Sequence, residues 1–350
     1  MDAHAIAPVS AERRLAFPRD FGAHPDTRTE WWYATGWLQP EGLSGAPAAP
    51  AFGFQVTFFR SRSDVAADHP SRFAATQLIF AHAALTDLRG KRLRHDQRIA
   101  RRGFGIAEAA EDDTRVALRG WRFERSGAVD ASRYRAVLAS DAGGFGFDFD
   151  LATTRAVLLQ GEAGFSRKGP RPGQASHYYS QPQLAVAGTL TLDGRPQRVQ
   201  GRAWLDHEWS DALLDAEAVG WDWIGFNLFD GGALTAFRLR RADGSAVYAG
   251  GSFRPAGLDG RSFAPDAVRF IAQRTWQSAA SRATYPVVWQ IDTPAGRHTV
   301  RALLDDQELD SRASTGAIYW EGLSELLDER GQRVGLGYLE MTGYAARLKL

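Results

Sequence analysis

Short segments in which apolar and polar residues alternate with period two run through most of the chain, and they constrain its fold most strongly. Clear examples are residues 32–38, 52–59 and 145–151. Such alternation is typical of half-buried β-strands. Turn signals such as Asp193-Gly194 and Asp243-Gly244 separate successive segments. The pattern therefore predicts an all-β protein made of barrels or sandwiches.

Length and composition refine this prediction. The chain has 350 residues, more than a single core usually supports, so two domains are expected. Its 36 glycines, 20 phenylalanines and 11 tryptophans suit aromatic-rich strands joined by tight turns. A turn-rich stretch at 166–173 separates two halves of similar strand pattern. We therefore predict an N-terminal domain over residues 1–185 and a C-terminal domain over 186–350, with one short helix at 210–218.

Charge and cysteine content exclude several classes of partner. The 42 basic and 41 acidic residues leave a net charge of +1, so no broad attraction to nucleic acid or an anionic membrane is expected. No run of 18 apolar residues is present, and no membrane span is predicted. The absence of cysteine rules out disulfides and thiolate metal ligands. The first residues lack the basic start and apolar core of a signal peptide.

Motifs for common cofactors are also missing. The sequence has no phosphate-binding loop, no dinucleotide-binding glycine motif and no Gly-x-Ser-x-Gly. His207-Glu208 resembles the start of a zinc-protease motif, but Asp211 stands where the second histidine is required. We therefore expect no cofactor and no metal.

The densest group of reactive residues is Asp206-His207-Glu208, which precedes Trp209. On a strand, His207 and Trp209 share one face, whereas Asp206 and Glu208 share the other. Burial raises the pKa of a carboxylic acid and makes it a usable proton donor near neutrality. Asp206, His207 and Glu208 are therefore the candidate catalytic residues. The alternative is that the acids bind backbone groups at a bulge and that His207 is a core histidine.

Acidic, phenolic and aromatic side chains in other strands are candidates for holding a substrate. The predicted substrate-binding residues are Glu30, Trp31, Tyr33, His82, Tyr178, Tyr179, Trp209, Trp221, Asp222, Trp223 and Glu321. The indoles of Trp221 and Trp223 fall on one strand face, where they can line an apolar pocket and stabilise a developing cation. An aromatic core is the alternative for this pair, and a satisfied core histidine is the alternative for His82. Acids buried in apolar strands need polar partners.

Several segments, taken together and in order, resemble the carotenoid 1,2-hydratase/AttH family from about residue 20 to the C-terminus. They are His24-Pro25-Asp26-Thr27-Arg28-Thr29-Glu30-Trp31-Trp32-Tyr33, Ala81-His82-Ala83, Tyr178-Tyr179-Ser180-Gln181-Pro182, Trp204-Leu205-Asp206-His207-Glu208-Trp209-Ser210, Gly220-Trp221-Asp222-Trp223, Tyr319-Trp320-Glu321-Gly322 and Gly337-Tyr338-Leu339-Glu340. The resemblance implies two tandem lipocalin-like domains. Some members of the family add water to the terminal double bond of acyclic carotenoids, relatives are pericyclases, and many bacterial members are labelled predicted secreted hydrolases. It also implies a periplasmic or secreted location, with the cytoplasm as the alternative.

Three functions are compatible with these residues. The first is an enzyme that hydrates an apolar isoprenoid or polyene, or catalyses a related lyase or cyclisation reaction. In it, Asp206 or protonated His207 would protonate a double bond, while Trp209, Trp221 and Trp223 would shield the cation. The second is a binding or transport protein for the same kind of small apolar molecule. The third is a hydrolase or metal-assisted enzyme, which the opposite faces of adjacent strand residues disfavour.

Overall fold

The computed structural model describes residues 9–43, 50–65, 69–211 and 214–348. Within them the chain forms two antiparallel sheets and three short 3-10 helices, with no α-helix. The bounds of the elements are η1 Arg19–Phe21, β1 Thr29–Pro40, β2 Phe52–Arg62, β3 Gln77–Asp87, β4 Arg92–Arg101, β5 Ala107–Ala109, β6 Arg115–Leu118, β7 Trp121–Ser126, η2 Val129–Ala131, β8 Arg133–Ala139, β9 Phe145–Ala152, β10 Leu158–Leu159, β11 Phe165–Arg167, β12 Ala175–Leu192, β13 Arg195–Ser210, β14 Gly220–Leu228, β15 Ala233–Arg240, β16 Ala246–Arg254, β17 Arg261–Ser262, η3 Pro265–Ala267, β18 Arg269–Gln277, β19 Thr284–Thr293, β20 Gly296–Ala302, β21 Glu308–Asp310, β22 Ile318–Leu327 and β23 Arg333–Met341.

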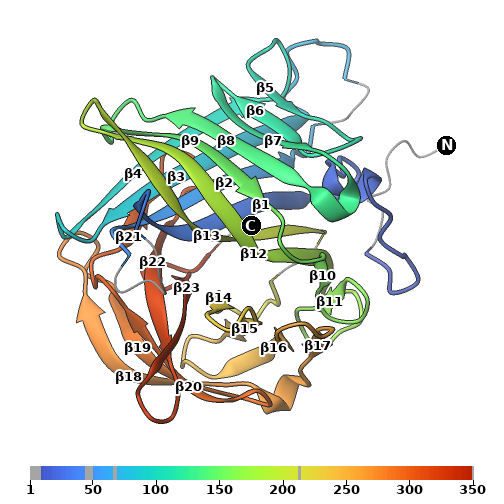
Figure 1. The fold of residues 1–350 in the computed structure, drawn as a ribbon. Helices are drawn as coiled ribbons and strands as arrows, with labels where there is room; N and C mark the ends of the chain where they lie inside the picture. Colours follow the sequence, from blue (N-terminus) through green and yellow to red (C-terminus); the bar gives the residue numbers. More distant parts are fainter. Residues whose placement is uncertain (1–8, 44–49, 66–68, 212–213, 349–350) are drawn as a thin grey trace.

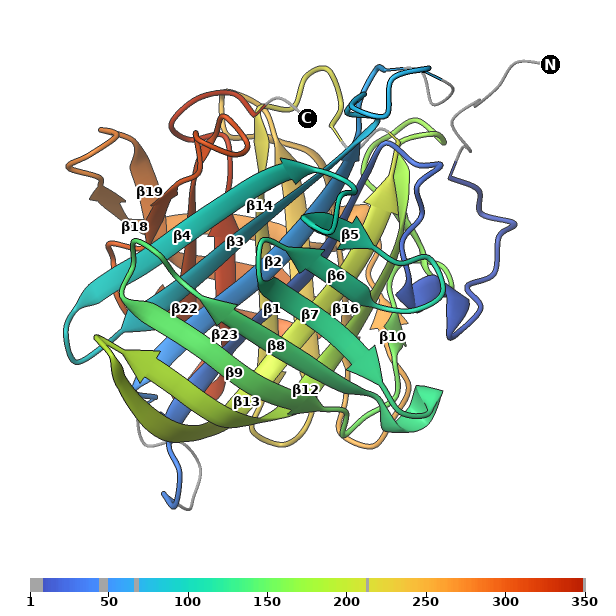
Figure 2. The same cartoon turned by 90° about the horizontal axis from the view of Figure 1, so that it is seen from above.

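The first sheet has the strand order β4-β3-β2-β1-β13-β12-β9-β8-β7-β6-β5, with β10 and β11 added beside β12. It curls until β3 and β4 lie against β5 and β6, which closes a barrel (Figures 1 and 2). Its interior is filled by inward-facing side chains such as Trp32, Phe54 and Phe149. The alternation in β1 explains this core, because Trp32, Ala34 and Leu38 point inward.

The second sheet has the order β17-β16-β15-β14-β23-β22-β20-β19-β18, with β21 beside β22. It curls around its own apolar core, which includes Ile224, Trp289 and Leu339. The all-β prediction with two lipocalin-like barrels is therefore confirmed. Among the described residues, no helix is long and apolar enough to cross a membrane.

The two barrels pack against each other through the outward faces of their central strands. Strands β1, β2, β12 and β13 of the first sheet contact β14, β22 and β23 of the second (Figure 1). The side chains between them form a third apolar cluster, in which Tyr33 and Trp204 meet Trp223. Strand β1 is buried along nearly its whole length. One of its faces packs into the core of the first barrel, and the other packs into the apolar cluster between the barrels.

Two sequence-based expectations differ from the structure. The helix predicted at 210–218 is wrong for its described part: Ser210 ends β13, residues 214–218 form bends and turns, and residues 212–213 lie outside the described residues. A helix this short gains little stability from its own hydrogen bonds. The boundary predicted after residue 185 falls inside β12, which forms a hairpin with β13 in the first sheet. The second sheet begins at Gly220, so strand pairing divides the chain between Ser210 and Gly220.

Candidate active site

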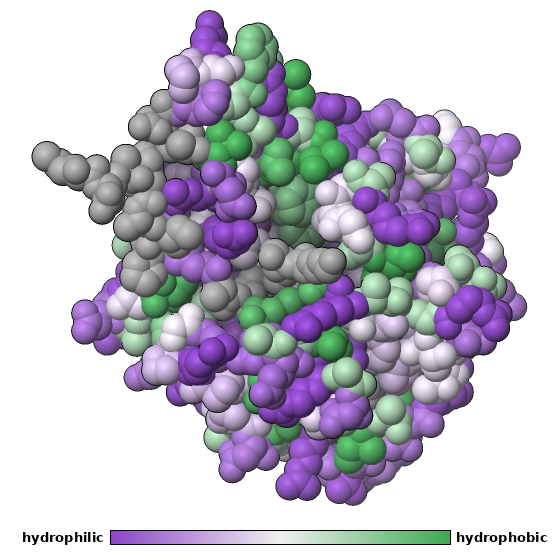
Figure 3. Space-filling model, turned by 180° about the vertical axis from the view of Figure 1, so that it is seen from behind, coloured by the Kyte–Doolittle hydropathy of each residue, from purple (hydrophilic) through white to green (hydrophobic). Residues whose placement is uncertain are grey.

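A cavity of about 550 Å³ lies between the two barrels. Its walls come from β1, β2, β3 and β13 on one side and from β14, β22 and β23 on the other. The face shown in Figure 3 is hollowed where hydrophobic side chains gather. A cavity of this size, apolar with a few converging polar groups, is typical of a small-molecule site.

Asp206 on β13 faces this cavity and is held by three donors. Its Oδ1 accepts hydrogen bonds from Ser180 Oγ at 2.5 Å and from Trp204 Nε1 at 2.7 Å. Its Oδ2 accepts one from the Tyr178 hydroxyl at 2.7 Å. Burial raises the pKa of Asp206 to about 7, because the loss of water outweighs these hydrogen bonds. Asp206 therefore exchanges a proton in the neutral range.

Glu208 lies two residues further along β13 and faces the same cavity. Its Oε1 accepts a hydrogen bond from Ser176 Oγ at 2.5 Å and forms an ion pair with Lys168 Nζ at 2.9 Å. The Lys168 ammonium also lies over the rings of Tyr178 and Phe237. Glu208 thus has a cationic partner, which Asp206 lacks among the described residues.

Glu321 on β22 and Glu340 on β23 form a second acidic pair on the opposite wall. They are direct partners in the antiparallel register, so their side chains lie next to each other on one face. Burial, followed by the charge of Glu340, raises the pKa of Glu321 well above 4.5. Burial also raises the pKa of Glu340 to about 8, although Trp221 Nε1 donates a hydrogen bond to its Oε1 at 3.1 Å. The cavity therefore holds carboxylic acids that keep their protons near neutral pH.

Aromatic rings form much of the remaining wall. Trp31, Trp221 and Trp223 line the cavity, and the rings of Tyr33 and Trp223 meet edge to face at 5.4 Å. Gly225 makes room for the Trp223 indole, since a Cβ at this position would lie 2.3 Å from ring atom Cη2. The indole faces can therefore pack against an apolar ligand.

A chain of hydrogen bonds links His82 to Glu321 across the two barrels. His82 Nδ1 lies 2.8 Å from the Tyr319 hydroxyl, and His82 Nε2 lies 2.8 Å from Ser314 Oγ. Gln55 Nε2 donates to the Tyr319 hydroxyl at 3.2 Å and to Glu321 Oε2 at 2.7 Å. Burial lowers the pKa of His82 to about 3, so its imidazole is neutral. The chain fixes the orientation of the Gln55 amide and of the Glu321 carboxyl group.

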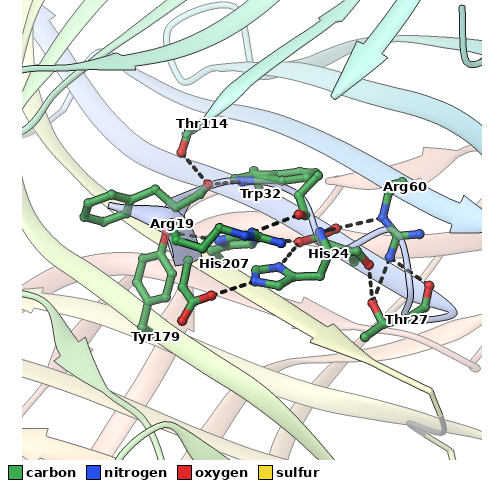
Figure 4. Close-up of polar contacts among 12 residues, drawn as sticks. Arg19, His24, Thr27, Trp32, Arg60, Thr114, Tyr179 and His207 are labelled. Atoms are coloured by element: carbon green, nitrogen blue, oxygen red, sulfur yellow. Dashed lines mark hydrogen bonds and ion pairs between the residues drawn. The ribbon is translucent and has the colours of Figure 1, made fainter. Parts of the chain in front are cut away.

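A separate polar network, here called the Glu30 network, lies on the opposite face of β1 and β13 (Figure 4). Its members are Asp20, His24, Glu30, Arg60, Tyr179 and His207. Glu30 Oε1 contacts His24 Nδ1 at 2.7 Å and His207 Nε2 at 2.8 Å, while Oε2 accepts from Arg60 Nε at 2.7 Å. Burial opposes ionisation of Glu30, but His24, Arg60 and these hydrogen bonds hold its pKa well below 4.5. Burial lowers the pKa of His207 to about 4.

The ligand atoms of His24, Glu30 and His207 lie within 4.8 Å of one another, which raises the question of a metal site. Both imidazoles contact the same oxygen of Glu30 directly, and Arg60 is paired with the other oxygen. The Arg60 guanidinium paired with the carboxylate opposes a metal cation, and the two N···O separations of 2.7 and 2.8 Å are ordinary hydrogen-bond distances. The donors therefore fit a hydrogen-bonded network better than a metal centre.

The structure brings together some of the predicted site residues and separates others from the cavity. The predicted residues that line it are Trp31, Tyr33, His82, Asp206, Glu208, Trp221, Trp223 and Glu321. Tyr178 lies behind Asp206 as a hydrogen-bond donor. Strand alternation places Glu30, Tyr179, His207 and Trp209 on the other face, in or beside the Glu30 network. Asp222 also turns away, to Arg238 and Tyr344 in the second barrel.

Other cavity residues were not among the predicted site residues. Gln55, Lys168, Tyr319 and Glu340 belong to this group. Tyr319 and Glu340 lie in motifs that carry the family resemblance, and the alternation of β22 and β23 could have placed them beside Glu321. Lys168 follows β11 within the turn-rich stretch, where the sequence carries no signal for its pairing with Glu208.

Protein stability is expected to fall by at least about 2 kcal/mol as the pH rises from 7 to 9. Asp206 and Glu340, with pKa values of about 7 and 8, hold protons in the folded chain that they have lost in the unfolded chain, and so does Glu321, whose pKa burial raises well above 4.5. Raising the pH therefore favours unfolding. Buried His82 and His207 have lowered pKa values, and their imidazoles are mostly neutral in the unfolded chain as well above pH 7. Urea unfolding at the two pH values measures the slope, which an Asp206→Asn/Glu340→Gln double variant should reduce; a stability that is constant or rises in the wild type contradicts the assignment.

Fold and cavity together define a protein of two lipocalin-like barrels that enclose an acid-lined apolar site between them. The chain belongs to the AttH-like family, whose model matches residues 8–344. The comparison with curated proteins finds no match. The family resemblance of the sequence motifs is thereby confirmed.

Solved structures agree with this assignment. A protein from Nitrosomonas europaea that is assigned as an AttH is 46% identical, with a TM-score of 0.87 over 97% of this chain and 99% of that chain. Kievitone hydratase from Nectria haematococca is 15% identical, with a TM-score of 0.69 over 98% and 97%. CghA, in a structure with Sch210972, is 12% identical, with a TM-score of 0.54 over 91% and 88%. At the two lower identities the likeness establishes the fold alone.

Proposed function

We propose that this protein is a hydratase-type enzyme that adds water across a carbon–carbon double bond of an apolar small molecule held between the barrels. One observation carries the proposal: Asp206, Glu321 and Glu340, all with raised pKa values, face one aromatic-walled cavity. Protonation of carbon near neutral pH requires such an acid in a water-poor site. The similar fold of an enzyme named for the hydration of kievitone supports this reading.

Asp206 is the proposed proton donor, because its pKa of about 7 lets it give and retake a proton at neutral pH. Its proton bonds to one carbon of the double bond while the π bond breaks. The oxygen of a water molecule bonds to the other carbon, and the proton that this water loses returns to Asp206. Glu208, two residues away on the same face, is placed to orient the water.

The other predicted catalytic residue, His207, has a different part in this proposal. It lies behind the cavity wall, between Glu30 and Tyr179. From there it positions β1 and β13, on which Tyr33 and Asp206 are register partners. Trp31, Trp221 and Trp223 hold the apolar body of the substrate.

Incubation with isoprenoid, polyene and prenylated aromatic alkenes in ¹⁸O-labelled water tests the proposal. We expect one class to yield a product heavier than its substrate by one labelled water molecule, as detected by mass spectrometry. Heat-denatured protein is the control. Saturable quenching of tryptophan fluorescence without any product would contradict catalysis and support a binding or transport protein. Labelled cleavage products would instead support a hydrolase.

A further inference from the structure

Three side chains that line the cavity carry a buried polar atom with no hydrogen-bond partner among the described residues. The atoms are the Tyr33 hydroxyl, Glu321 Oε1 and Gln55 Oε1. Of these, the phenol and the neutral acid can donate a hydrogen bond, whereas the amide oxygen can only accept one. The side chains of Tyr33 and Glu321 lie close together in the cavity wall: burial first, and then the nearby Glu321 carboxyl group, raises the pKa of the phenol. A buried polar atom without a partner is unfavourable, so such atoms call for a ligand.

The hydrogen bonds around Glu321 fix which of its oxygens can donate. Gln55 Nε2 donates to Glu321 Oε2 at 2.7 Å, and Gln55 is oriented in turn by Tyr319 and His82. Because Oε2 acts as an acceptor, the proton of the neutral acid belongs on Oε1. Burial and the neighbouring Glu340 keep this acid protonated, and burial also keeps the proton on Tyr33. Two O–H donors are thus available on one side of the cavity.

We infer that Tyr33 and Glu321 form a binding site for a carbonyl oxygen, so that the substrate is an apolar α,β-unsaturated ketone, aldehyde or ester. A carbonyl oxygen has two lone pairs and accepts two such hydrogen bonds. Neutral donors suit it well, because they stabilise the negative charge that develops on the oxygen during the reaction. This inference rests on the proposed hydration and narrows its substrate class.

The carbonyl site gives the hydration a definite direction. The oxygen of water bonds to the β-carbon, the π bond breaks, and its electrons move towards the carbonyl oxygen held by Tyr33 and Glu321. The α-carbon then takes the proton of Asp206, and the proton lost by the water restores Asp206. The sum is one water added to one double bond, and no oxidant, reductant or second substrate is consumed.

Two probes of equal shape test the site without relying on turnover. They are 4-phenyl-3-buten-2-one and the diene in which a CH₂ group replaces its carbonyl oxygen. Fluorescence titration should show the ketone binding at least about tenfold more tightly than the diene to the wild-type protein. Infrared spectroscopy with a ¹³C-labelled carbonyl should show its stretching frequency lowered on binding. Both effects should shrink in Tyr33→Phe and in Glu321→Gln, and stay unchanged in Tyr248→Phe, whose phenol does not line the cavity.

The outcomes separate this inference from the proposed function. Equal or absent binding of both probes to the wild type, or a carbonyl frequency unaffected by either substitution, overturns the carbonyl site. Hydration of a simple alkene, with no preference for binding the ketone, would support the proposed hydratase function and contradict the carbonyl site. A lowered carbonyl frequency that depends on both residues, without any ¹⁸O incorporation, supports the site while the hydratase proposal fails.

Discussion

Replacing Glu30 with glutamine is expected to lower the free energy of unfolding by about 3–5 kcal/mol. Glutamine keeps the size of the side chain but carries no charge, so the guanidinium of Arg60 stays buried without its counter-charge. The side chains of Arg60 and Glu30 are 1% and 0% exposed, and water cannot compensate for the loss. Glutamine keeps only one oxygen, so its NH₂ group must face either Arg60 or the two histidines, His24 and His207, that contact Glu30 Oε1. Urea unfolding monitored by tryptophan fluorescence measures the effect.

Glu41→Gln is the matched control for this substitution. Glu41 pairs with Arg198 at 3.2 Å, but these side chains are 49% and 58% exposed. An exposed pair contributes at most about 1 kcal/mol, so the control should unfold almost like the wild type. If Glu30→Gln and Glu41→Gln lost equal stability, the Glu30 network would not stabilise the first barrel as argued.

Asp206→Asn is expected to lower kcat by about 100-fold or more, the usual cost of losing a general acid. Asparagine has nearly the same shape and can still accept hydrogen bonds from Tyr178, Ser180 or Trp204, so the fold should be kept. Ligand affinity, followed by fluorescence quenching, should change little, because the aromatic wall remains. Turnover assays with the alkene found by ¹⁸O labelling measure the loss.

Asp193→Asn serves as the control for Asp206→Asn. Asp193 lies in the exposed turn between β12 and β13, where it pairs with Arg94, and its positive φ of 48° suits asparagine. Its turnover should equal that of the wild type. Wild-type turnover should also decline as the pH rises above about 7, where Asp206 loses its proton. Full activity of Asp206→Asn would remove Asp206 as the proton donor.

Strand alternation made much of the first barrel predictable. The period-two pattern identified the strands, and it placed Asp206 and Glu208 on the face opposite His207, as the structure shows. The turn at Asp193-Gly194 was likewise readable, because the dipeptide lies between two alternating segments.

Contacts between distant parts of the chain were not predictable. His207 meets Glu30 across 177 positions and Gln55 meets Glu321 across 266, and no local pattern specifies such pairings. The boundary predicted after residue 185 falls inside β12 for a related reason. A turn-rich loop inside a sheet, such as residues 166–173, has the same composition as a linker between domains.

Strands β1 and β13 form a partition between two environments. The inward side chains of Trp32 and His207 serve the barrel, whereas those of Tyr33 and Asp206 serve the cavity. Substitutions at alternating positions of the same strand therefore act on different properties. During evolution, substitutions at the cavity-facing positions can therefore change ligand preference while the stability of the barrel is conserved. A mutant library confined to the cavity-facing positions of β1, β14 and β22 would exploit this independence to change which ligands the protein prefers.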